Sequence, residues 1–167
     1  SQLAVLIQLA LKLALKRGRI DEAAYQQITR DLTSVPEKVQ EFLDRNETRM
    51  KALAAKYKDS KAFLFLGRGL TAATAAEGSL KLLEITYIPS MAYPAGESKH
   101  GPISLVEKGF PVFFVCPRDE SRKLVMGNME EMMARDASII SIMEEGDEEV
   151  KRMSGDYVEV PKLSSPF

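Results

Sequence analysis

The spacing of hydrophobic residues along this chain changes near residue 60. Before that point they recur every three or four residues, as in Val39, Phe42 and Leu43, which is typical of amphipathic helices. After it, short continuous apolar runs alternate with stretches of helical spacing. This alternation predicts a parallel sheet with helices on both faces. The expected strands are 62–66, 91–93, 111–116, 138–143 and 157–160.

Helices are expected on both sides of this change. The first, 1–15, is apolar almost all round, so we expect it to be buried. Asp21 can cap a second helix over 22–32, and Pro36 marks the start of a third that reaches about residue 57. Between the strands, the pattern predicts helices over 71–87, 98–106, 120–135 and 145–153. The expected fold class is α/β: a three-layer α/β/α domain with a five-stranded parallel, flavodoxin-like sheet, preceded by a helical segment.

Composition narrows the range of functions. The 167 residues are 45% hydrophobic and 28% charged, which is typical of one globular domain, and the net charge of -1 attracts neither nucleic acid nor an anionic membrane. Gln8 and Lys12 interrupt the apolar opening, which argues against a signal peptide or a membrane span. The single Cys116 excludes an internal disulfide and fits a reducing compartment, so we expect a cytoplasmic protein with Cys116 in the core.

Three charged residues, Glu77, Lys81 and Glu84, are aligned on one face of the expected helix 71–87. One explanation is a solvated edge held by pairing between neighbouring turns, and spacing alone favours it. The other is a carboxylate beside an ammonium at the carboxyl end of the sheet. There, a Glu shielded from water would have a raised pKa and could move a proton between carbons. Gly78 on the same helix should permit close packing.

The only histidine, His100, lies in a loop bounded by Pro94 and Pro102. It either hydrogen-bonds the backbone or acts as an acid and base, and both explanations stay open. The sequence has no second His, no Cys pair, no Gly-x-Ser-x-Gly elbow and no Walker loop, so we expect neither a metal site nor serine or nucleotide hydrolysis. The glycines of Gly67-Arg68-Gly69 could expose amides to an anion, although any strand-to-helix turn favours glycine.

Three segments occur in an order and at separations that resemble one known family. They are residues 65–69, 77–88 and 93–102, the last reading Tyr-Pro-Ala-Gly-Glu-Ser-Lys-His-Gly-Pro. Together they resemble the second sugar isomerase (SIS) lobe of the glutamine:fructose-6-phosphate aminotransferases. The resemblance runs from residue 1 to about residue 160.

The resemblance implies an enzyme that aminates fructose 6-phosphate with ammonia from glutamine and isomerises the product to glucosamine 6-phosphate. It implies that Glu84 moves the proton between C1 and C2, that Lys81 supports it, and that His100 assists ring opening. In this family the histidine reaches the site of a neighbouring subunit, so a homodimer is expected. No cofactor is required. Further contacts with the sugar phosphate are expected from Glu77, Gly67, Gly69, Thr71 and Lys99.

The same resemblance divides the chain into three parts. Residues 1–18 resemble the closing helix of a preceding SIS lobe, 19–60 are connecting helices, and 61–167 are the second lobe, truncated at its C-terminus. The family's Ser/Thr-rich phosphate loop, glutaminase domain and lysine-bearing tail have no counterpart in the sequence, so we expect this fragment to be inactive alone. Two alternatives stay open: another SIS-type phosphosugar isomerase, deaminase or deglycase, and a non-catalytic module that senses phosphosugars.

Overall fold

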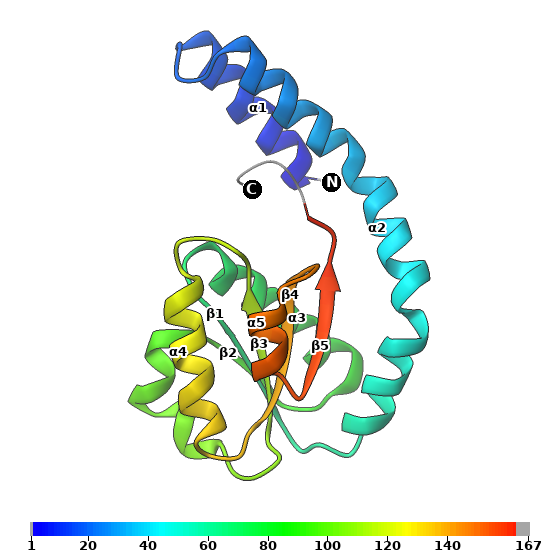
Figure 1. The fold of residues 1–167 in the computed structure, drawn as a ribbon, viewed down its shortest axis with the longest axis vertical. Coiled ribbons are helices and arrows are strands. Elements are labelled where there is room, and N and C mark those ends of the chain that lie inside the picture. The colour runs from blue at the N-terminus through cyan, green and yellow to red at the C-terminus, as the bar shows by residue number, and fades with distance from the viewer. Residues whose placement is uncertain (1, 163–167) are drawn as a thin grey trace. The chain divides into compact units, whose positions relative to one another are not determined.

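A parallel sheet organises the larger part of the structure, a computed structural model that describes residues 2–162 (Figure 1). Its strands are ordered β2-β1-β3-β4-β5, the flavodoxin-like order predicted from the sequence, and every neighbouring pair is parallel. All five expected strands are confirmed. Their bounds are β1 Phe63–Gly67, β2 Ser90–Pro94, β3 Pro111–Cys116, β4 Ser138–Glu144 and β5 Asp156–Val160.

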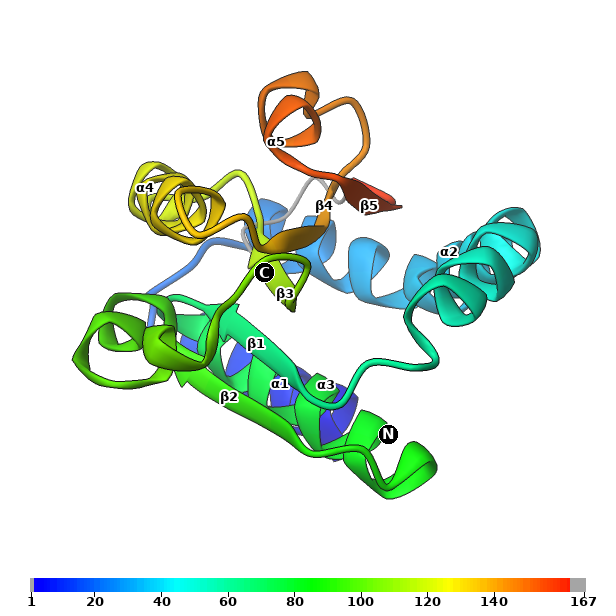
Figure 2. The same cartoon turned by 90° about the horizontal axis from the view of Figure 1, so that it is seen from below.

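Helices cover both faces of this sheet, as expected for three layers. Because side chains alternate along a strand, Leu64 and Leu66 of β1 enter one core while Phe63 and Phe65 enter the other. The first core is closed by α4 (Arg122–Met133) and α5 (Glu148–Met153), and the second by α3 (Leu70–Thr86). Figure 2 shows α4 and α5 on the face of the sheet away from α3.

The chain separates into two compact units, one of them Asn46–Val160 and the other Ser1–Arg45 with Pro161–Phe167. Helix α1 (Gln2–Lys16) belongs to the second unit, and the expectation that it is buried is wrong, because Leu11 is its one buried residue among those described. None of the described helices is long and apolar enough to cross a membrane.

Helix α2 (Glu22–Tyr57) begins at the expected cap, where Asp21 Oδ1 accepts the Ala24 amide at 2.8 Å. The predicted break at Pro36 is wrong, since α2 continues through it as one helix of 36 residues. A proline removes one amide donor from a helix but leaves the other bonds of that helix in place. In a helix this long, the remaining backbone hydrogen bonds keep it continuous on both sides of the proline.

The segment predicted as a helix over 98–106 is instead two short 3₁₀ turns, η1 (Ala95–His100) and η2 (Pro102–Leu105). Gly101 between them has φ of 151°, which no helix allows, and the following proline cannot donate a helical hydrogen bond. By contrast, the prediction for Gly78 is confirmed. A Cβ at that position would lie 3.2 Å from the Phe65 ring, so the glycine lets α3 approach β1 closely.

Candidate functional site

The charged stripe predicted from the sequence lies on the outer face of α3. Lys81 Nζ is 2.7 Å from Glu84 Oε2 and 3.7 Å from Glu77 Oε1, and all three side chains are half or more exposed. The hydrogen bond to Glu84 is the main reason that the pKa of Lys81 is raised. Within this chain, therefore, Glu84 is paired but not shielded from water.

Glu84 lies toward the amino ends of the strands, and the expectation that it would lie at their carboxyl ends is wrong. Helix α3 starts just after β1 ends at Gly67, then runs back along the sheet. Its far end lies close to the start of β1, where the Phe63 amide donates to Pro89 O at 3.0 Å. At about 1.5 Å per residue, Glu84 is roughly 20 Å from the start of its helix.

His100 lies at the opposite end of the sheet from Glu84. It ends η1, which follows directly after the last residue of β2, Pro94, and its side chain is exposed. One copy of the chain therefore does not bring Glu84 and His100 together. The pair can share a site only if the two residues come from different copies.

The turn from Gly67 to Thr71 is held by hydrogen bonds between its own residues. Thr71 Oγ1 accepts the Arg68 amide at 2.9 Å, and the Thr71 and Ala72 amides donate to Arg68 O and Gly69 O. A Cβ on Gly67 would lie 2.2 Å from Thr71 O, and Gly69 has φ of 58°. The sharp turn of the backbone accounts for the glycines at positions 67 and 69. The amides of Arg68, Thr71 and Ala72 already have hydrogen-bond partners in this chain.

A cavity of about 500 Å³ lies between η1 and α4, and we call it the η1–α4 cavity. It brings Lys99 and His100, two residues singled out in the sequence, beside Arg68 of the β1–α3 turn. Lys99 Nζ reaches Glu131 Oε1 of α4 at 2.6 Å, and this bond is the main reason that the pKa of Glu131 is lowered. Sequence reasoning missed the residues of α4 because only the fold brings that helix to η1.

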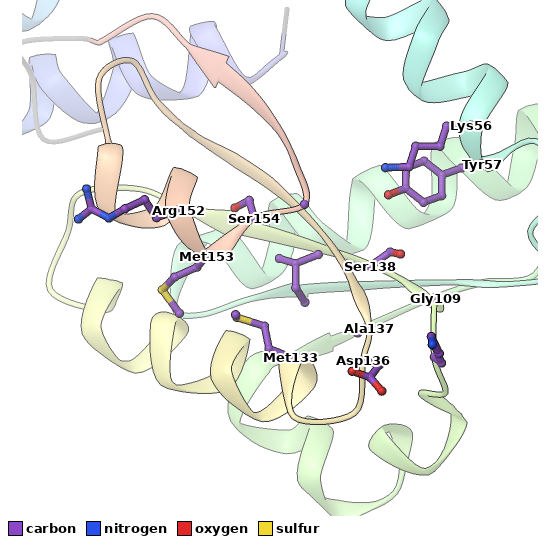
Figure 3. Close-up of a pocket in the computed structure, with 13 residues that line it drawn as sticks. Lys56, Tyr57, Gly109, Met133, Asp136, Ala137, Ser138, Arg152, Met153 and Ser154 are labelled. Atoms are coloured by element: carbon purple, nitrogen blue, oxygen red, sulfur yellow. The ribbon is translucent and has the colours of Figure 1, made fainter.

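A second cavity, of about 560 Å³, lies at the amino ends of β4 and β5 (Figure 3). Lys56 and Tyr57, at the end of α2, line it, and Lys56 Nζ and Tyr57 OH each lie 2.6 Å from Asp156 Oδ2. Burial is the main reason that the pKa of Tyr57 is raised. These bonds join the end of α2 to the start of β5. Because ligands of open α/β sheets bind outside the carboxyl ends of the strands, this cavity is the less favoured site.

Asp147 is the most buried charged residue described, and the sequence analysis missed it. Its carboxylate receives Arg122 Nε at 3.0 Å and Nη2 at 2.8 Å, and it caps α5 by accepting the Val150 amide. The bonds from Arg122 are the main cause of its lowered pKa. The available signal was an Asp placed directly before Glu148 and Glu149, a common way for a helix to start.

Cys116 is fully buried, as expected for a core residue, and burial raises its pKa to about 12. Among residues 2–162, no group of three or more His, Cys, Asp or Glu side chains is arranged to hold a metal ion. The candidate chemistry of the described chain therefore rests on Glu84 with Lys81 on α3 and on His100 in the η1–α4 cavity.

Comparison with known proteins places these features in a family context. The SIS domain family matches residues 56–161. The glutamine–fructose-6-phosphate aminotransferase (isomerizing) of Chlorobaculum tepidum is 40% identical over 162 residues, covering 96% of this chain and 26% of that protein. The Thermotoga maritima protein of the same name is 41% identical over 161 residues, with the same coverage. This chain thus spans about a quarter of the length of these curated relatives.

A solved structure shows the same relationship in three dimensions. The C-terminal domain of glucosamine-fructose-6-phosphate aminotransferase from Francisella tularensis superposes with a TM-score of 0.84 and 32% identity. The match covers 92% of this chain and 43% of that one.

Proposed function

This chain belongs to the SIS domain family, and from that premise we propose that it is the second SIS lobe of an isomerising glutamine:fructose-6-phosphate aminotransferase. Such an enzyme converts fructose 6-phosphate and glutamine-derived ammonia to glucosamine 6-phosphate, which feeds amino sugar and UDP-GlcNAc synthesis. The observation that carries the proposal is the paired, open carboxylate of Glu84 on α3, in a chain whose relatives bear that activity in their names.

In this proposal, Glu84 is the base of the isomerisation. After ammonia has replaced the carbonyl oxygen at C2 as an imine, with release of water, the Glu84 carboxylate takes a proton from C1 and returns it to C2. The hydroxyl proton on O1 passes to the imine nitrogen in the same conversion, leaving an aldehyde at C1 and an amine at C2. Lys81, 2.7 Å away, holds the carboxylate in place and balances the negative charge of the intermediate. No cofactor is needed, because two adjacent carbons exchange one proton.

A carboxylate that is half exposed needs a second surface before it can act as an efficient base. In water, its charge is fully solvated, whereas a covered site raises the pKa toward the working pH. We propose that the missing surface belongs to a first SIS lobe, and that residues 1–18 are the closing helix of that lobe. The exposed Leu3, Leu6 and Leu9 of α1 fit a helix that packs against further chain. Alone, this lobe should not turn over sugar phosphate.

His100 acts, in this proposal, at the site of a neighbouring subunit, where it assists opening of the sugar ring. The separation of Glu84 and His100 along the sheet supports an arrangement of two copies, and hence a homodimer. Of the other predicted contacts, Glu77, Thr71 and Lys99 already have partners in this chain. Gly67 and Gly69 remain candidates for contact with the sugar phosphate.

A chimera tests the proposal directly. This chain would replace the matching 162 residues of the Chlorobaculum tepidum relative, and glucosamine 6-phosphate formation would be measured. The unmodified chimera should be active, and Glu84→Gln should lower turnover by about 10²- to 10⁴-fold, the usual contribution of a general base. Glu77→Gln is the matched control, since it removes a carboxylate beside the same lysine, and it should change turnover only a few-fold.

Two results would contradict the proposal. One is a folded chimera that makes no glucosamine 6-phosphate while the parent enzyme does. The other is full turnover by the Glu84→Gln chimera. If that variant instead bound fructose 6-phosphate and lost turnover, a purely sensing module would be excluded, because a sensor has no use for a base at this position.

A further inference from the structure

The segment that carries His100 is held more firmly at its start than at its end. In η1, Ala95 and Ser98 are fully buried, and the Ser98 hydroxyl donates to Ala95 O at 2.7 Å. The His100 side chain, at the other end, is exposed and forms no hydrogen bond or ion pair with residues 2–162. Gly101 follows with φ of 151°, so no regular helix extends beyond His100 to fix its place.

One ion pair joins the end of η1 to the rest of the fold. Lys99, the residue before His100, has its Nζ 2.6 Å from Oε1 of Glu131 on α4. Within the described part of the chain, this is the one ion pair or hydrogen bond that connects a side chain of η1 to another element. Both side chains are partly exposed, so the pair should add little to the stability of the fold. Its main effect is on the position of the end of η1.

A buried amide on α4 orients Glu131. Asn128 lies one turn earlier, is 4% exposed, and its Nδ2 donates to Glu131 Oε2 at 3.2 Å. Because a carboxylate can only accept, this bond fixes which way the amide faces. Asn128 Oδ1 is then buried with no hydrogen-bond partner among the residues described. An apolar side chain would avoid the cost of that unpaired oxygen, so what the amide provides is its bond to Glu131.

We propose that Glu131 is a positioning residue for His100. Held by Asn128, it fixes Lys99 and therefore the end of η1, so that the imidazole of His100 is in place to assist opening of the sugar ring. The inference rests on the proposed function, from which it takes this role of His100. Ring opening breaks the bond between C2 and O5, moves the O2 hydroxyl proton to O5 and leaves a ketone at C2. A group that assists must come within about 2.6–3.2 Å of the atom that gives or takes the proton.

Two substrates separate ring opening from the steps that follow it. Fructose 6-phosphate is mainly a closed ring in water, whereas 5-deoxyfructose 6-phosphate has no O5 with which to close the furanose ring and stays open. A variant that impairs only ring opening should therefore lose activity toward the first substrate and keep it toward the second. A variant that merely loosens the fold should lose activity toward both.

The chimera described above allows this comparison. Glu131→Ala should lower kcat/KM for fructose 6-phosphate by about 10- to 10²-fold, the cost of a small misplacement, and leave kcat/KM for 5-deoxyfructose 6-phosphate nearly unchanged. His100→Ala should show the same selectivity with a larger loss, and Glu84→Gln should lower both values. Glu130→Ala is the matched control, since it removes the neighbouring, exposed carboxylate of α4, and it should change neither value.

NMR relaxation of the 167-residue chain measures the positioning itself. In Glu131→Ala, the backbone order parameters of Lys99 and His100 should fall from about 0.85 toward about 0.6, while those of Ala95 and Ser98 stay high. The melting temperature should stay nearly unchanged, because the lost ion pair is partly exposed. Unchanged order parameters at Lys99 and His100 would show that Glu131 does not fix this segment, and would overturn the proposal.

The kinetic outcomes distinguish this inference from the proposed function. If His100→Ala is selective and Glu131→Ala loses no activity, or loses it equally with both substrates, the positioning role is wrong while the role of His100 stands. If His100→Ala is not selective, its role in ring opening is wrong and the inference falls with it. Full turnover by Glu84→Gln would contradict the proposed base without affecting the link between Glu131 and His100. If Glu131→Ala does not fold, Lys99→Met breaks the same ion pair, and undiminished activity of that variant overturns the proposal.

Discussion

Two carboxylates in this chain pair with a cation at nearly the same distance but in very different surroundings. Asp147 is 1% exposed and meets Arg122 at 2.8 Å, whereas the Glu84 side chain is 50% exposed and meets Lys81 at 2.7 Å. The buried group also accepts a backbone amide, and its pKa is lowered. The distance between the two charged groups therefore does not decide whether an ion pair stabilises the fold. Burial makes Asp147 a structural group, while exposure leaves Glu84 free to meet a second surface.

The largest effect should come from breaking the buried pair. Asp147→Ala removes the buried partner of Arg122, which keeps only the exposed Glu149 at 2.8 Å, and removes the cap of α5, so the free energy of unfolding should fall by about 2–4 kcal/mol. Urea unfolding followed by circular dichroism measures this loss. Glu84→Gln, measured in the same way, should leave the midpoint within error, because an exposed pair adds little. Equal losses in the two variants would remove the distinction drawn between the pairs.

A smaller loss is expected on the inner face of α3. Gly78→Val would press a side chain onto the Phe65 ring, where even a Cβ lies 3.2 Å away, and overpacking of this kind costs about 1–3 kcal/mol. Ala76→Val, on the exposed side of the same helix, is the control for the lower helix propensity of valine. If both variants lost the same stability, the inner face of α3 would be no more tightly packed than the outer one.

The loss of stability at acid pH should depend in part on the buried carboxylate of Asp147. Because the pKa of folded Asp147 is lowered, mainly by Arg122, its contribution is present above the unfolded pKa of about 3.9 and is lost as pH falls through the lower folded value. The stability of Asp147→Asn should therefore depend less on pH below about 4 than that of the unmodified chain. Parallel pH profiles from urea titrations would show that Asp147 does not contribute to acid unfolding.

The smallest effect is expected from the exposed lysine. Lys81→Met removes both ion pairs of the α3 stripe, yet the melting temperature should stay nearly unchanged at physiological salt, where surface charges are screened. Thermal unfolding in low and high salt provides the measurement. A large drop in both would show that the stripe stabilises the fold, and would favour the solvated edge over a catalytic role.

The sequence predicted the inner strands β1, β3 and β4 well because each is a short apolar run that a doubly covered parallel sheet can bury. The edge strands β2 and β5 are only partly buried, yet their shorter apolar runs were enough to find them. Prediction failed where one residue type suits two structures. Pro36 is compatible with a helix start and with a long helix, and Gly101 divided a segment whose composition looked helical. The spacing of Glu77, Lys81 and Glu84 put them on one face of α3, but only the direction of that helix shows which end of the sheet they approach.

Parts of the candidate sites could not be predicted because they depend on contacts distant in sequence. Glu131 and Asn128 lie about 30 residues beyond Lys99, on a helix whose pattern indicates only that it covers the sheet. The burial of Asp147 likewise follows from the packing of α4 against α5, which places Arg122 over it. Residue identity gave the candidates, and the fold decided which of them meet.

The central claim is that Glu84 moves the proton between C1 and C2, and the most direct measurement follows that proton. Fructose 6-phosphate deuterated at C1 would be given to the chimera with ammonia or glutamine, and loss of deuterium from C1 would be timed by NMR at C1, which detects it whether the deuterium passes to C2 or to solvent. We predict that Glu84→Gln slows this loss by about 10²- to 10⁴-fold while Glu77→Gln leaves it nearly unchanged. Deuterium loss from C1 at the unmodified rate in the Glu84→Gln chimera would contradict the account.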